Sequence, residues 1–149
     1  MEYLNNPESE IYKKILEKQK SFITTRFSLI RNRYLDDTCC VVGEKKVIAK
    51  HLNQGLAQNL VQTFFNFKYT TCLICRGKKG ENNIRQLERA HCNILSDPRY
   101  DLLMLAIDDL WVDNITPLGS GDILKLFIKK HEICPIYYLC NICHNKYDN

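Results

Sequence analysis

The sequence predicts an α+β fold, in which a helical N-terminal region precedes a smaller core of strands, helices and a metal site. Apolar residues recur at helical spacing over 7–35 and 48–64, shorter alternating segments follow them, and two C-x-x-C pairs lie far apart. The chain has 149 residues, of which 45% are hydrophobic. That is enough for one packed domain, with or without a helical extension. We place the division between a basic helical region, 1–68, and the core, 69–149.

The helical region carries two helix patterns. Residues 7–35 predict one long helix, because Pro7 and Ser9 suit its start and its apolar residues fall near one face. Many of its other positions are basic: Lys13, Lys14, Lys18, Lys20, Arg26, Arg31 and Arg33. Residues 48–64 have an apolar residue at every fourth position and predict a second helix, despite Gly55 inside it.

The core is expected to contain three strands and a helical insertion. Residues 65–75 alternate and predict a strand that enters the first cysteine pair, while 84–92 and 134–140 predict two more. The insertion covers 97–131, where Asp97 suits the N-cap of a helix and Pro98 its first turn.

The cysteine spacing predicts a structural metal site. Cys72 and Cys75 form one C-x-x-C pair, and Cys140 and Cys143 form another after 64 intervening residues. Four thiolates suit tetrahedral zinc, and a site closed by four protein ligands is structural. A redox dithiol would require a helix start in a βαβ context, which the pattern lacks, and iron–sulfur ligation has weaker support. The remaining cysteines are expected to be buried free thiols: Cys39, Cys40, Cys92 and Cys134.

The N-terminal residues, the lengths of the apolar runs and the distribution of charge narrow the class of protein. The first ten residues are polar and acidic, unlike a secretory signal, and no apolar run approaches the roughly 20 residues that span a bilayer. We therefore expect an intracellular protein, cytoplasmic or nuclear, with no membrane partner.

Charge is unevenly distributed along the chain. Residues 1–91 carry 16 Lys or Arg against 9 Asp or Glu, whereas 92–149 carry 5 against 8. The basic part suits a polyanion such as nucleic acid, or a solvated surface.

Three motifs in order resemble one enzyme family. The first C-x-x-C pair is followed by "LERAH", residues 87–91, and then by "LCNICHNKYD", residues 139–148. This arrangement resembles the HNH endonucleases, also called His-Me finger or ββα-metal nucleases. The resemblance covers residues 71–149 and implies a zinc-stabilised treble-clef core with a ββα-metal site. Residues 1–65 take no part in it.

The resemblance also implies roles for individual residues. The four paired cysteines would hold structural zinc, and His91 would be the general base that activates water. His144 would ligate a catalytic Mg²⁺ or another divalent ion, and Asp148 would support it as a ligand or through His144.

The sequence departs from the family at three points. Ala90 precedes the base where an Asp or His ligand is often found, and Pro135-Ile136 stands where the family has Asn-Leu. Three residues are candidates for the missing asparagine, and spacing does not choose among them: His131, Asn93 and Asn114. The separation of 49 residues between His91 and Cys140 is also longer than usual.

The resemblance implies a metal-dependent DNA endonuclease that hydrolyses phosphodiester bonds, of the restriction, mobile-element or viral type. Basic residues near the active hairpin would contact DNA: Arg76, Lys78, Lys79, Arg85 and Arg89. Palindromic cutting would require a homodimer. The alternative is a non-catalytic zinc-binding module for nucleic acid or protein, in which His91 is a structural histidine or a zinc ligand beside Cys92.

Overall fold

The computed structural model describes residues 1–33 and 40–149, with side chains described for 1–28 and 40–149. Cys39 and the expected end of the first helix at 34–35 lie outside the described residues. The fold combines helices with two small antiparallel sheets, as an α+β chain should. Its helices and 3₁₀ turns are η1 (Glu2–Asn5), α1 (Glu10–Arg33), α2 (Lys45–Asn53), α3 (Leu56–Phe64), α4 (Pro98–Leu110), α5 (Ser120–Lys130), η2 (His131–Ile133) and α6 (Asn141–Asp148). Its strands are β1 (Cys40–Val41), β2 (Leu87–His91), β3 (Leu118–Gly119) and β4 (Ile136–Cys140).

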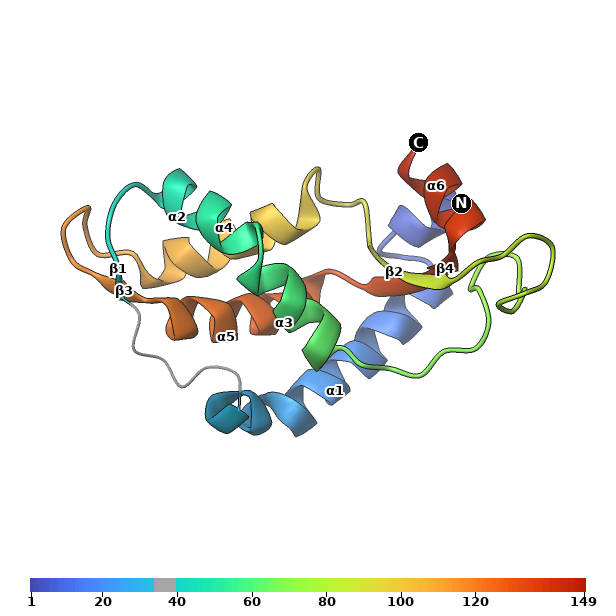
Figure 1. Cartoon of the computed structure of the whole chain (residues 1–149), viewed down its shortest axis with the longest axis horizontal. Helices are drawn as coiled ribbons and strands as arrows, with labels where there is room; N and C mark the ends of the chain where they lie inside the picture. Colours follow the sequence, from blue (N-terminus) through green and yellow to red (C-terminus); the bar gives the residue numbers. More distant parts are fainter. Residues whose placement is uncertain (34–39) are drawn as a thin grey trace.

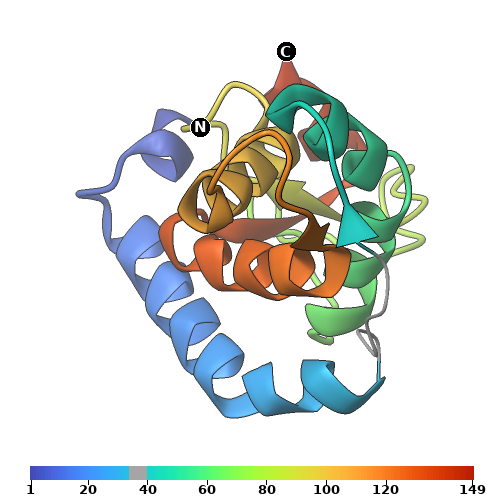
Figure 2. The same ribbon diagram turned by 90° about the vertical axis from the view of Figure 1, so that its left-hand side faces the viewer.

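The long helix α1 begins where the sequence predicts. The Ser9 hydroxyl accepts a hydrogen bond from the Tyr12 N–H at 3.3 Å and so caps the first turn. Figures 1 and 2 show α1 running along one side of the molecule. Gln19 ties its buried face to the core, donating to the carbonyls of His131 and Cys134 at 2.6 and 2.7 Å and accepting from the Ile136 N–H at 2.8 Å.

The second expected helix is wrong as a single element. It is divided into α2 and α3, and Gly55 stands before the first residue of α3 with φ −154° and ψ −63°. A helix-interior glycine costs about 1 kcal/mol relative to alanine, so the break falls at the weakest point of the pattern. The two short helices can then direct separate apolar faces into the core.

The helices predicted within 97–131 are confirmed in outline, while their role as an insertion stays a prediction. Asp97 and Pro98 stand at the start of α4, although the Asp97 side chain makes no capping hydrogen bond. Helices α2, α4 and α5 pack together at the end of the molecule that also carries the short β1–β3 pair (Figure 1). That pair was not predicted, because two-residue strands have no periodicity to detect.

The strands of the core are two and not three. β2 and β4 pair antiparallel in the expected places, with Leu87 opposite Cys140 and His91 opposite Ile136. The expected strand over 65–75 is wrong, because that segment forms no ladder. Its alternating aromatic residues pack on other rings instead: Phe67 lies 4.3 Å from Phe22 between ring centroids, and Tyr69 stacks on Tyr138 at 4.0 Å.

The chain enters α6 directly from β4, and the N-terminal turn packs beside it. Both termini lie at that end of the molecule in Figure 1, where the Tyr147 hydroxyl bonds to Asn5. The Tyr137 hydroxyl donates to the Leu4 carbonyl at 2.6 Å. Residues on both sides of position 68 thus share one core, while the division into two functional regions stays a prediction.

Candidate functional site

Four cysteine side chains converge at one end of the β2–β4 pair. The Sγ atoms of Cys72, Cys75, Cys140 and Cys143 all lie within 4.8 Å of one another. Cys75 is exposed and the other three are buried. Four soft sulfur donors in so small a space fit a single metal ion in a site with no place left for substrate.

The first pair lies on a tight turn that brings both sulfurs into the cluster. The Cys72 N–H donates to the Gly77 carbonyl at 2.9 Å, and the Gly77 N–H donates to the Cys75 sulfur at 3.4 Å. Arg76 between them has φ 64°, in the left-handed region. Burial raises the pKa of the Cys72 thiol, but hydrogen bonds from Cys140, Cys75 and Ile74 have a larger combined effect in the opposite direction. Together they lower the pKa of Cys72 to about 7. The Cys72 thiolate is thus accessible near neutral pH, whereas burial raises the pKa of Cys143.

The second pair lies at the junction of β4 and α6. Cys140 occupies the N-cap position of α6, and its sulfur accepts a hydrogen bond from the Cys143 N–H at 3.3 Å. Cys143 is on the first turn of the helix, so one short segment supplies two donors. The Cys75 and Cys140 sulfurs are 3.9 Å apart, although 65 positions separate them in sequence.

The other cysteines that the structure describes do not join this cluster. Cys92 and Cys134 are buried, as predicted, and burial raises the pKa of Cys134 to about 12. Their sulfurs contact carbonyl oxygens, Cys92 that of Leu4 at 3.3 Å and Cys134 that of Cys92 at 3.7 Å. Cys40 is exposed on β1, so its predicted burial is wrong.

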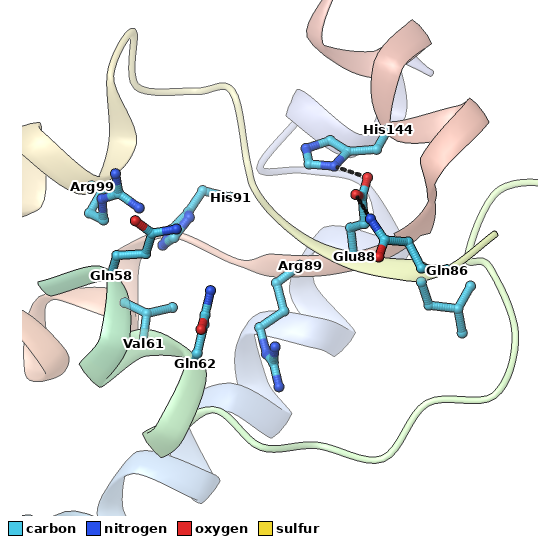
Figure 3. A pocket seen from close by; sticks show the side chains of 10 residues that line it. Gln58, Val61, Gln62, Gln86, Glu88, Arg89, His91, Arg99 and His144 are labelled. Carbon is cyan, nitrogen blue, oxygen red and sulfur yellow. Dashed lines mark hydrogen bonds and ion pairs between the residues drawn. The ribbon is translucent and has the colours of Figure 1, made fainter. Parts of the chain in front are cut away.

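The two histidines singled out by the sequence line one cleft of about 340 Å³. Its walls come from α3, β2, the start of α4 and α6, and His91 and His144 lie in different parts of it (Figure 3). The other lining residues are Gln58, Val61, Gln62, Gln86, Leu87, Glu88, Arg89 and Arg99.

His91 is held by a second histidine. Its Nε2 lies 3.0 Å from Nε2 of His131, and Nδ1 of His131 lies 2.9 Å from the carbonyl oxygen of Phe127. A carbonyl only accepts, so Nδ1 of His131 carries the proton and its Nε2 accepts from His91 Nε2–H. In this arrangement Nδ1 of His91 is the nitrogen that keeps a free lone pair.

Both rings of this pair are neutral at pH 7. Loss of hydration on burial, and then the nearby Arg99 charge, lower the pKa of His91 to about 4. Burial and the neighbouring His91 lower the pKa of the fully buried His131 to about 3. Of the three candidates for the missing asparagine, His131 is the one that touches His91. Asn93 instead bonds to Tyr147, and Asn114 lies in the exposed loop before β3.

His144 has carboxylates on both ring nitrogens and takes no part in the cysteine cluster. Its Nδ1 is 3.0 Å from an oxygen of Glu88, and its Nε2 is 3.1 Å from an oxygen of Asp148. Glu88 comes from β2, whereas Asp148 lies one turn further along α6. The side chains of His144 and Glu88 are half-buried, and that of Asp148 is exposed.

Glu88 is a site residue that the sequence analysis did not identify. Side chains two positions apart in a strand point to the same face, so Glu88 lies on the face of Ala90, the position at which HNH endonucleases often have a ligand. The signal was present in "LERAH", but only the contact with His144 shows that the carboxylate reaches the site.

The five basic residues proposed for DNA contact lie in different places. Arg89 lines the cleft, and Arg85 lines a neighbouring hollow with His144 and Asp148. Arg76, Lys78 and Lys79 are exposed in the loop beyond the cysteine cluster and do not line the cleft.

In the part of the chain that the structure describes, no helix combines the length and apolar character needed to cross a membrane.

Comparisons with protein-family models, curated proteins and solved structures found no match to the chain.

Proposed function

We propose that the protein is a metal-dependent DNA endonuclease of the HNH type, which hydrolyses phosphodiester bonds in the cleft that His91 and His144 line. The observation that carries the proposal is this shared cleft, in which a neutral imidazole and a carboxylate–imidazole pair come from β2 and α6. Two antiparallel strands followed directly by a helix agree with the ββα arrangement of that family.

The four-cysteine cluster would hold structural zinc at the base of a treble-clef core. Mutual sulfur distances within 4.8 Å fit a thiolate-bound ion. The ion would join the 72–77 turn to the start of α6 and so orient His144 relative to β2.

Glu88 and His144 would hold the catalytic divalent ion, with the Glu88 carboxylate in place of the ligand missing at Ala90. Asp148 would keep the proton on Nε2 of His144 and leave Nδ1, which faces Glu88, for the ion. A carboxylate and an imidazole suit Mn²⁺ well, and Mg²⁺ would rely more on the carboxylate and water. When bound, the ion would stabilise negative charge developing on the phosphate.

His91 would act as the general base through Nδ1. Its Nε2–H is held by His131, which sets the ring orientation and leaves the Nδ1 lone pair to accept a proton from water. Desolvation keeps the ring neutral and ready to accept this proton, although a pKa of about 4 makes it a weak base in the free protein. A phosphate beside the ring would raise that pKa, because a nearby negative charge favours the imidazolium.

A plasmid-nicking assay with magnesium or manganese tests the proposal. We expect the wild-type protein to nick supercoiled DNA and His91→Ala to lower the rate by about 10²- to 10⁴-fold. His51→Ala is the matched control, since His51 is exposed on α2 and outside the cleft. Cleavage that survives in His91→Ala with unchanged zinc content would remove His91 from the mechanism.

A non-catalytic zinc-binding module that binds nucleic acid or protein is the second candidate. Ala90 favours it, and so do the two carboxylates that already occupy the nitrogens of His144. Absence of cleavage by the wild-type protein on supercoiled, linear and single-stranded DNA, with zinc bound, would select this candidate.

A further inference from the structure

Two arginines in the cleft carry positive charge that no carboxylate neutralises. Arg89 and Arg99 both line the cleft with His91, and both are half-buried. Among the described residues neither has a carboxylate within ion-pair distance, whereas Glu88, the acidic residue of the cleft, is engaged by His144. A partly desolvated cation without a counter-charge is unfavourable, so the cleft is suited to receive an anion.

Each guanidinium is held in place through its Nε–H by a neutral acceptor. Nε of Arg89 donates to the Phe65 carbonyl at 2.8 Å, and Nε of Arg99 donates to the Asn53 side-chain oxygen at 2.5 Å. The Arg89 guanidinium also lies 5.5 Å from the ring centre of Tyr138. Because neutral acceptors leave the cation uncompensated, these bonds orient the two groups and preserve their attraction for anions.

The two arginines stand on either side of His91. Arg89 precedes it by two positions on β2, on the same strand face, and Arg99 comes from the first turn of α4 (Figure 3). Arg89 and His91 are separated by roughly 6.6 Å along β2, with Arg99 on the other side of His91, and a nucleic-acid strand carries one phosphate per nucleotide. Two cations in this arrangement suit consecutive phosphates of one strand better than a single isolated anion.

We propose that Arg99 and Arg89 form a clamp for two successive phosphates of one nucleic-acid strand, with Arg99 on the phosphate nearest His91. The inference rests on the proposed function for the direction of the strand past His91. It assigns the helical insertion a part in substrate binding, because Arg99 belongs to α4. Binding through the clamp requires no divalent ion.

Fluorescence anisotropy of a labelled single-stranded oligothymidine, without added magnesium or manganese, tests the clamp. We expect Arg99→Gln and Arg89→Gln each to weaken binding about tenfold, and each to reduce the slope of log affinity against log salt by about 0.7. The matched control is Arg26→Gln on α1, an exposed arginine over the ring of Phe22 and outside the cleft. Equal losses in all three variants would show a diffuse basic surface and overturn the clamp, as would unchanged binding in Arg99→Gln.

Two further variants separate charge from structure. Asn53→Ala breaks the same hydrogen bond as Arg99→Gln but keeps the Arg99 charge. The slope of log affinity against log salt should therefore remain that of the wild-type protein. Arg99→Lys should keep most of the slope and lose part of the affinity, because lysine lacks the planar fork. A slope reduced as much by Asn53→Ala as by Arg99→Gln would overturn the clamp.

The clamp and the proposed function can fail separately. Loss of binding in the two cleft variants, combined with no cleavage by the wild-type protein, would leave the clamp standing and reject the endonuclease. Cleavage with binding and rate unaffected by Arg99→Gln would reject the clamp and leave the endonuclease standing.

Discussion

The cysteine cluster and the histidine cleft both involve the β2–β4 pair but differ in how their polar groups are satisfied. At the end where Leu87 faces Cys140, four identical donors converge within 4.8 Å. The cleft extends from Glu88 and His144, beside that end, to His91, which faces Ile136 at the other end. Its unlike groups bind one another in pairs, and its arginine charge remains unneutralised. A cluster of identical donors is typical of a binding site for a metal ion that stabilises a fold. Unlike groups around an open cleft are typical of a site that awaits a ligand.

The largest effect should come from breaking the cysteine cluster. Cys140→Ser is expected to abolish tight metal binding and to unfold β2, β4 and α6, because structural zinc contributes about 10–16 kcal/mol in small domains. Zinc content and thermal unfolding measure the effect. Cys40→Ser, which changes an exposed thiol outside the cluster, is the control and should melt like the wild-type protein. A Cys140→Ser variant that keeps its zinc and its melting temperature would contradict the structural role.

The next effect concerns the ion expected beside His144. Glu88→Gln should weaken Mn²⁺ binding about 10- to 100-fold, because a ligand carboxylate is lost. Asp148→Asn should weaken Mn²⁺ binding less, since Asp148 is exposed and bonds to Nε2 of His144, the nitrogen opposite the one that faces Glu88. Calorimetric titration of the zinc-loaded protein with Mn²⁺ compares the two variants. If Asp148→Asn proves the more damaging, the ion belongs on the other side of His144.

A smaller effect should appear in stability against pH. His91 and His131 have pKa values lowered to about 4 and about 3 in the folded protein, against about 6.5 in the unfolded chain. Below pH 6.5 the unfolded chain therefore binds more protons, and stability falls as the pH falls toward 4. By pH 5 each ring would account for about 2 kcal/mol.

Denaturant unfolding between pH 7 and pH 5, with zinc content monitored, measures this dependence. His131→Asn should flatten it relative to the wild-type protein, whereas His51→Asn, at an exposed position, should leave it unchanged. An equally steep dependence in His131→Asn would show that the acid sensitivity arises elsewhere.

The smallest expected effect is a gain in stability at the turn that carries Cys72 and Cys75. Arg76 has φ 64°, a conformation that costs a non-glycine residue roughly 1 kcal/mol. Arg76→Gly should therefore raise the free energy of unfolding by up to about 1 kcal/mol, part of which is offset by glycine entropy. Thermal unfolding compares it with Lys79→Gly in the same loop, where φ is negative and a small loss is expected. Equal losses in both variants would show that Arg76 is not strained.

Local patterns predicted much of the fold. The start of α1 at Ser9, the strands β2 and β4, and the helices within 97–131 all carry short-range signals and are found in place. The strand expected over 65–75 failed because alternation shows only that every second residue is aromatic or apolar and does not show what each one packs against. Here the rings of Phe67 and Tyr69 pack on other aromatic residues, and no partner strand is needed.

The sequence by itself determined the four members of the cysteine cluster, and its resemblance to the HNH endonucleases pointed to the two histidines that line the cleft. Repeated donors at close spacing can be recognised along the chain, because a turn of two to three residues brings them together. Only the tertiary structure decided that Glu88 meets His144 across 56 positions, that His131 holds His91 across 40, and that Arg99 enters the cleft. Such partners meet because β2, α3, α4 and α6 surround one cleft, and contact between distant segments leaves no periodic signal in the sequence.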